Sequence, residues 1–132
     1  MNRNTLHGTV IHGDRIGRGI GFPTANLHTD DPLPENGIYV ALMEWESGNG
    51  YGMLYIGNRP TVGGTEKRVE MHLLDFNGEL YGQSVSIQII HFLRKEKKFE
   101  QTSALQEQLR ADRKQTEEYL ALLLKDKNSP CI

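Results

Sequence analysis

The sequence has one cysteine, no long apolar run and a polar beginning, and each of these features excludes a class of protein. A single cysteine cannot form an internal disulfide, and we interpret Cys131, close to the end of the chain, as incidental. No stretch approaches the roughly 20 apolar residues of a membrane-spanning helix, so we expect no membrane partner. Residues 1–9 are polar and lack the apolar core of a signal peptide, so we expect a cytoplasmic location.

The charges show no strong excess of either sign, with 15 Lys and Arg against 17 Asp and Glu and a formal net charge of −2. Such a chain has no overall positive field, so we expect no nucleic-acid partner. Its 132 residues, 37% of them hydrophobic, are enough for one compact core. We therefore predict a single domain over residues 1–132.

The first two thirds of the chain predict strands, because β-branched and aromatic runs alternate with Gly, Pro and Asn. The 38–45 run is apolar on both alternating faces, which predicts a strand in the middle of the sheet. The apolar phase changes after Ile89, which predicts a bulge or a strand end covered on both sides. The candidate strands are residues 6–12, 22–27, 38–45, 51–57, 69–76 and 84–93.

Two turns and one helix complete the prediction. The Ser-Gly-Asn-Gly cluster within residues 46–50 predicts a hairpin, and Asn77-Gly78 predicts a type I′ hairpin between antiparallel neighbours. Residues 102–125 carry leucines at helical spacing behind a Ser103 and Gln106 capping box. Together these elements predict a small, mainly β, antiparallel barrel over about residues 6–94, capped by a C-terminal helix over about 102–125.

The densest glycine segment runs from Gly13 to Asn26, where successive glycines let backbone amides approach an anion. Its spacing fits neither a P-loop nor a dinucleotide fingerprint. Pro23 fixes the backbone before Thr24 and Asn26, which point the same way on an extended segment. Hydroxyl and amide oxygens suit Mg²⁺. By itself the segment also fits an ordinary surface loop.

Two further segments carry polar groups suited to chemistry. Glu70 and His72 share one face of a predicted strand, where a carboxylate can accept a proton from an alcohol; the alternative is a solvated surface pair. Between Phe92 and Phe99 lies a basic cluster in which Arg94 could hold a phosphate or a polar ring edge and Phe99 could stack on a planar ligand. The alternative there is a charged connection with Phe99 packed under the helix.

In this order, the segments resemble the riboflavin kinase (flavokinase) family, including the kinase module that many bacteria fuse to a flavin adenylyltransferase. The resemblance runs from about Gly8 to Asp112. The motifs that carry it are Pro-Thr-Ala-Asn at residues 23–26, Glu-Met-His at 70–72, and Arg94 with Glu96, Lys97 and Phe99.

The resemblance implies a six-stranded antiparallel Greek-key barrel and the Mg²⁺-dependent reaction of riboflavin with ATP to give FMN and ADP. Glu70 would be the general base toward the ribityl 5′-hydroxyl, and Thr24 and Asn26 would bind the metal and the nucleotide phosphates. The other ATP-binding positions it implies are Gly13, Arg18 and Gly21 in a flap and Leu73, Asp75 and Tyr81 near the adenine. The flavin-binding positions it implies are Arg94, Lys97 and Phe99.

The implied partners are riboflavin and FMN, and ATP and ADP. Nothing in the sequence resembles the adenylyltransferase half, so the expected product is FMN and the expected state is a monomer, unless the chain is fused to or cut from such a domain. One alternative is a non-catalytic flavin- or nucleotide-binding module of the same fold. Another is a barrel that binds single-stranded nucleic acid, which the acidic balance of charges disfavours.

Overall fold

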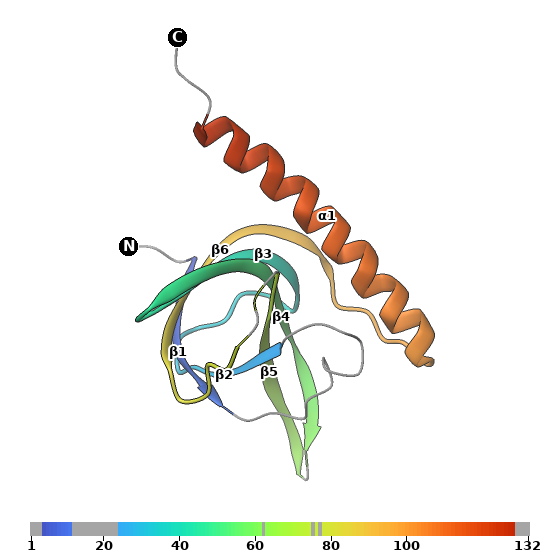
Figure 1. Ribbon diagram of the computed structural model, residues 1–132. Helices are drawn as coiled ribbons and strands as arrows, with labels where there is room; N and C mark the ends of the chain where they lie inside the picture. The colour runs from blue at the N-terminus through green and yellow to red at the C-terminus, as the bar shows by residue number, and fades with distance from the viewer. Residues whose placement is uncertain (1–3, 12–23, 62, 75, 77, 129–132) are drawn as a thin grey trace. The chain divides into compact units, whose positions relative to one another are not determined.

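The computed structural model describes residues 4–11, 24–61, 63–74, 76 and 78–128. The chain divides into two compact units, Met1–Lys97 and Lys98–Ile132. The first unit carries all the strands of the described residues, and the second carries the helix (Figure 1). The strands are β1 (Thr5–Ile11), β2 (Thr24–His28), β3 (Gly37–Trp45), β4 (Gly48–Thr61), β5 (Gly64–Leu73) and β6 (Ser84–Lys95).

The strands close into a barrel in the order β1-β2-β5-β4-β3-β6, and β6 pairs back onto β1. Every pairing is antiparallel. The meander β3-β4-β5 is followed in space by β2, which precedes it in the chain, so the connection is a Greek key. The predicted six-stranded barrel is confirmed.

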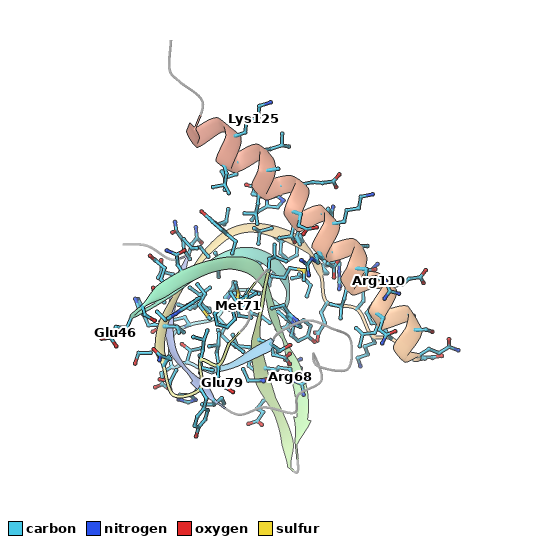
Figure 2. All side chains as sticks on the ribbon, in the orientation of Figure 1. Glu46, Arg68, Met71, Glu79, Arg110 and Lys125 are labelled. Atoms are coloured by element: carbon cyan, nitrogen blue, oxygen red, sulfur yellow. The ribbon has the colours of Figure 1, made fainter. Side chains whose placement is uncertain are left out.

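Successive side chains of a strand point to opposite faces of the sheet, so every second side chain of each strand points into the barrel and fills its core. Figure 2 labels Met71 of β5, which is fully buried in this core. The other face of the sheet is also buried where β3 and β4 meet, at Ile38, Val40 and Met53. The apolar run on both faces of β3 thus corresponds to burial on both faces of the sheet; β3 pairs with β4 and β6, and in a closed barrel every strand has two neighbours.

The predicted irregularity near the end of β6 is a bulge. Val40 pairs with His91 and Ala41 pairs with Ile89, so Ile90 has no partner in the register with β3. An extra residue of this kind bends the strand and increases its twist, which helps a small barrel to close. The phase change in the sequence therefore located a real feature of the barrel.

One predicted hairpin is confirmed and the other is wrong. The β3–β4 turn is tight, with Trp45 opposite Gly48. Asn77-Gly78 does not join paired strands, because β5 ends at Leu73 and pairs with β2 and β4, whereas β6 pairs with β1 and β3. A turn signal describes local backbone only, and here the chain crosses to another part of the barrel; Asn77 itself lies outside the described residues.

The helix α1 (Thr102–Asn128) confirms the predicted C-terminal helix. Its buried positions are spaced three or four residues apart and therefore share one face. They are Leu109, Asp112, Thr116 and Leu120. Among the described residues, the structure contains no helix that is long and apolar enough to cross a membrane.

Candidate active site

Four polar side chains lie together on β2 and β5, because the register of these strands places them opposite one another. Thr24 pairs with His72, and Asn26 pairs with Glu70. Their neighbours along the two strands, including Met71, face the barrel core, so these four point to the opposite face. The structure thus brings together the two polar pairs that the sequence placed on separate segments.

Glu70 is a buried carboxylate with a fixed cationic partner. Only 6% of the residue is exposed. Its Oε1 lies 3.1 Å from Nε of Arg68, two residues earlier on the same face of β5, where Figure 2 labels that side chain. A buried negative charge needs such a partner, because desolvation is costly for an ion without one. The alternative of a solvated surface pair is therefore wrong for Glu70.

His72 extends this polar line toward β2. It is also 6% exposed, with Nε2 3.8 Å from Oε2 of Glu70 and Nδ1 3.5 Å from Oγ1 of Thr24. The imidazole therefore lies between the carboxylate of β5 and the hydroxyl of β2. Arg68, Glu70, His72 and Thr24 form one continuous polar line across two strands.

The oxygen donors of this face fit a hard divalent cation such as Mg²⁺. Thr24 and Asn26 are half-buried and offer a hydroxyl and an amide oxygen, while Glu70 offers a carboxylate on the neighbouring strand. Mg²⁺ usually keeps several waters and takes few protein ligands beside substrate phosphates. Among the described residues, the structure has no group of three or more His, Cys, Asp or Glu side chains suited to a metal.

Glu70 also belongs to a row of residues that runs around the barrel. Consecutive registers place Asn26 opposite Glu70, Glu70 opposite Tyr55, Tyr55 opposite Ile38, and Ile38 opposite Arg94. Paired residues point to the same face, so these five side chains line the outer face at one level. Asn26 and Arg94, which the family resemblance assigned to ATP and to riboflavin, thus lie on the two sides of Glu70.

Sequence reasoning gave no role to Tyr55 or Arg68. The phenol of Tyr55 donates a 2.6 Å hydrogen bond to Oε2 of Glu96. Burial and this hydrogen bond both raise the pKa of Tyr55 well above its ordinary value. Arg68 could have been found from its two-residue spacing to Glu70, but the position of Tyr55 depends on a register that one sequence does not show.

Two of the remaining predicted ATP-side residues, Leu73 and Tyr81, lie in the part of the chain that the structure describes. Leu73 is buried in the core and pairs with Gly52. Tyr81 is 52% exposed, and its backbone N–H donates to Oε1 of Glu79 over 2.9 Å. The other predicted ATP-side positions lie outside the described residues, namely Gly13, Arg18, Gly21 and Asp75.

The predicted flavin-side residues divide between the two units. Arg94 is half-buried on β6, and one of its guanidinium N–H groups donates to the Lys95 carbonyl over 3.0 Å. Lys97 is exposed and ends the first unit, while Phe99 is half-buried in the second. Of the three, only Arg94 shares the row of Glu70.

Comparison with known proteins shows which family the chain belongs to. The sequence profile described as "Flavokinase: Riboflavin kinase" matches residues 2–120, which is most of the chain. The chain belongs to the riboflavin kinase family. The resemblance found in the sequence motifs is thereby confirmed.

Relatives of this riboflavin kinase family member include longer proteins. A bifunctional riboflavin kinase/FMN adenylyltransferase of Haemophilus influenzae is 38% identical over 109 residues, which are 81% of this chain and 35% of that protein. The chain thus spans about a third of that relative. A crystal structure from Streptococcus pneumoniae, titled a macrolide-efflux protein, is 36% identical with a TM-score of 0.75, covering 82% of this chain and 36% of the other.

A riboflavin kinase structure from Trypanosoma brucei shares the fold. Its TM-score is 0.61 at 23% identity, and the match covers 89% of this chain and 79% of that chain. At this sequence identity, the similarity shows only that the two proteins share a fold. The fold of this family member is thus found in a protein of clearly different sequence.

Proposed function

We propose that the chain is a riboflavin kinase that transfers the γ-phosphoryl group of ATP to the ribityl 5′-hydroxyl of riboflavin, giving FMN and ADP. One observation carries the proposal: the buried carboxylate of Glu70 lies directly opposite Asn26, beside the Thr24–His72 pair. A carboxylate that can accept a proton and oxygen donors suited to a phosphate-bound metal ion therefore share one face, which supports the proposal. Family membership supplies the substrate class.

In the proposed reaction Glu70 is the general base. The 5′-oxygen of riboflavin forms a bond to the γ-phosphorus, the bond from that phosphorus to the bridging oxygen of ADP breaks, and the hydroxyl proton passes to Glu70. Arg68, 3.1 Å from the carboxylate, holds it in one orientation before the proton arrives. Phosphoryl transfer depends mainly on alignment and charge neutralisation, so a fixed base suits it.

Thr24 and Asn26 are the proposed ligands of Mg²⁺ and of the nucleotide phosphates. When bound, the ion would neutralise phosphate charge during transfer. Both side chains project from the short strand β2, whose pairing with β5 fixes their distance from Glu70. The predicted ATP-side set (Gly13, Arg18, Gly21, Leu73, Asp75 and Tyr81) and flavin-side set (Arg94, Lys97 and Phe99) complete the proposal, in which residues 1–132 act as one kinase domain.

The decisive variant is Glu70→Gln, which keeps the shape of the side chain and removes the base. We expect kcat for FMN formation to fall by about 10²–10⁴, the usual contribution of general-base catalysis. The affinity for ATP should stay close to that of the wild type, because the carboxylate acts on the acceptor hydroxyl. The measurement is chromatographic separation of riboflavin and FMN after incubation with ATP and Mg²⁺.

Glu66→Gln is the matched control, since it makes the same change at an exposed site of β5 and should leave kcat unaltered. Omission of the metal should abolish FMN formation by the wild type. An unaltered kcat in folded Glu70→Gln protein would remove Glu70 from the mechanism. Riboflavin binding without any FMN from the wild type would instead indicate a non-catalytic binding module.

A further inference from the structure

A second carboxylate, Glu96, is held from two sides at the point where the chain leaves β6. Its Oε2 accepts the 2.6 Å hydrogen bond from the phenol of Tyr55, and its Oε1 accepts a 3.2 Å hydrogen bond from the amide of Asn36. The amide oxygen of Asn36 in turn accepts a 2.5 Å hydrogen bond from Nζ of Lys67. We call Asn36, Tyr55 and Glu96 the carboxylate clamp.

The clamp depends on a glycine in β4. A Cβ atom at Gly57 would collide with both the Tyr55 hydroxyl and the Glu96 carboxylate. Gly57 lies opposite Arg68, the ion-pair partner of Glu70. The absence of a side chain at this position therefore opens the space in which the carboxylate meets the phenol, beside the candidate active site.

The clamp also connects directly to the row of Glu70. Tyr55 is the residue of β4 that pairs with Glu70, so its ring lies next to the proposed base on the outer face. Glu96 lies two residues after Arg94 and directly before Lys97, both of which belong to the predicted flavin side. The hydrogen bond between Tyr55 and Glu96 thus ties the flavin-side segment to the strand beside the base.

The chemistry of the clamp suits a fixed connection. Hydrogen bonds to a charged acceptor are shorter and about twice as strong as those between neutral groups. Burial raises the pKa of Tyr55, and the hydrogen bond to Glu96 adds to this effect, so the phenol keeps its proton and stays a donor.

We propose that the carboxylate clamp positions the segment from Arg94 to Lys97 for binding riboflavin, and so sets the affinity for the acceptor but not for ATP. The inference rests on the proposed function, because it takes riboflavin as the acceptor. Asn36, Tyr55 and Glu96 are positioning residues: they act through the backbone that they hold and take no part in the phosphoryl transfer.

The test compares Tyr55→Phe and Glu96→Ala with the wild type, using the full chain. Each variant should weaken riboflavin binding by about tenfold, which corresponds to about 1.4 kcal/mol. ATP binding should stay within about twofold of the wild-type value. The double variant should be no worse than Glu96→Ala alone, because both changes break one connection. Riboflavin affinity is measured by quenching of flavin fluorescence.

Tyr51→Phe is the matched control, since it removes the same hydroxyl four residues earlier in β4 and should leave riboflavin affinity unchanged. Gly57→Ala gives an independent test, because the added Cβ atom would push the Tyr55 hydroxyl and the Glu96 carboxylate apart while all three clamp residues keep their identity. Thermal unfolding identifies any variant that fails to fold. If one clamp variant does not fold, the others decide the question.

Wild-type riboflavin affinity in folded Tyr55→Phe and Gly57→Ala proteins would overturn the inference, as would an equal loss of riboflavin and ATP binding. The readout is equilibrium binding, so it is independent of turnover. If the wild type binds riboflavin but forms no FMN, the proposed function fails, and the clamp is still judged by the riboflavin affinity of its variants.

Discussion

At the scale of single residues, Glu70 must meet two opposing requirements, a negative charge and a buried position. A base must be charged to accept a proton, yet Glu70 is buried on a barrel face where an isolated charge is costly. Arg68 offsets that cost at 3.1 Å. We therefore expect the loss of Arg68 alone to be visible in stability even without substrate.

We expect Arg68→Met to lower the free energy of unfolding by about 3 kcal/mol, because it leaves a buried carboxylate without its cation. Combining Arg68→Met with Glu70→Gln should restore most of the loss, since the uncompensated charge is then removed as well. Urea unfolding followed by circular dichroism measures both values. A double variant as unstable as Arg68→Met alone would show that Arg68 acts through its packing.

Arg113→Met provides the comparison for an exposed pair. Arg113 and Glu117 lie 3.3 Å apart on α1, and their side chains are 31% and 49% exposed. Solvent screens such a pair, so the expected loss is below about 1 kcal/mol. The difference between the two arginine variants therefore isolates the contribution of burial.

At the scale of the elements, local patterns in the sequence predicted the strands well but did not predict which strands pair. The apolar run on both faces of β3 and the phase change at Ile89 located a strand that is buried on both faces and a bulge, because periodicity is a local property. Asn77-Gly78 misled for the same reason: a turn signal does not say which strand the chain joins next. The β4–β5 hairpin, which turns through Gly63 at φ 88°, was not predicted.

The candidate site also shows the difference between local patterns, which the sequence reveals, and strand pairing, which it does not. Alternation along a strand placed Thr24 with Asn26, and Glu70 with His72, on shared faces. Their meeting depends on the register between β2 and β5, which spacing did not show; the family resemblance implied only that Thr24, Asn26 and Glu70 serve one reaction. Tyr55 has no motif of its own, and its role appears only when β4 lies beside β5.

The β4–β5 pairing gives a prediction at this scale. Gly52 lies so close to β5 that a Cβ atom would collide with the backbone carbonyl of His72, which cannot turn aside as a side chain could. We expect Gly52→Ala to lower the free energy of unfolding by about 1–3 kcal/mol, the usual cost of overpacking. Chemical denaturation provides the measurement.

Gly64→Ala is the matched control, because Gly64 also lies in this hairpin but has no atom within 4 Å of the added Cβ. Its effect should be within about 0.5 kcal/mol. Equal losses from both variants would mean that alanine disfavours these strands for reasons other than contact with His72. A loss confined to Gly52→Ala would locate the close approach of the two strands in solution.

At the scale of the whole molecule, closure makes the barrel's groups interdependent. All six strands have two neighbours, so the barrel has no free sheet edge, and distortion of one strand is passed to both neighbours. The row from Asn26 to Arg94 crosses five of these strands. The affinity for each substrate is therefore expected to depend on all the strands of the barrel. For the same reason, a change in the charge of a buried side chain should change the free energy of unfolding of the whole barrel.

Alkaline pH tests that dependence through Tyr55, whose pKa in the folded chain is raised by burial and by its hydrogen bond to Glu96. Above the unfolded value of 10.0, the unfolded chain loses this proton while the folded chain keeps it. The contribution of Tyr55 to the free energy of unfolding is thus fully present below pH 10. Above pH 10 this contribution should fall by about 1.4 kcal/mol per pH unit. Tyr55→Phe should show a flatter decline in urea unfolding between about pH 10 and 11.5. Parallel curves would mean that the phenol titrates in the folded protein as it does in the unfolded chain.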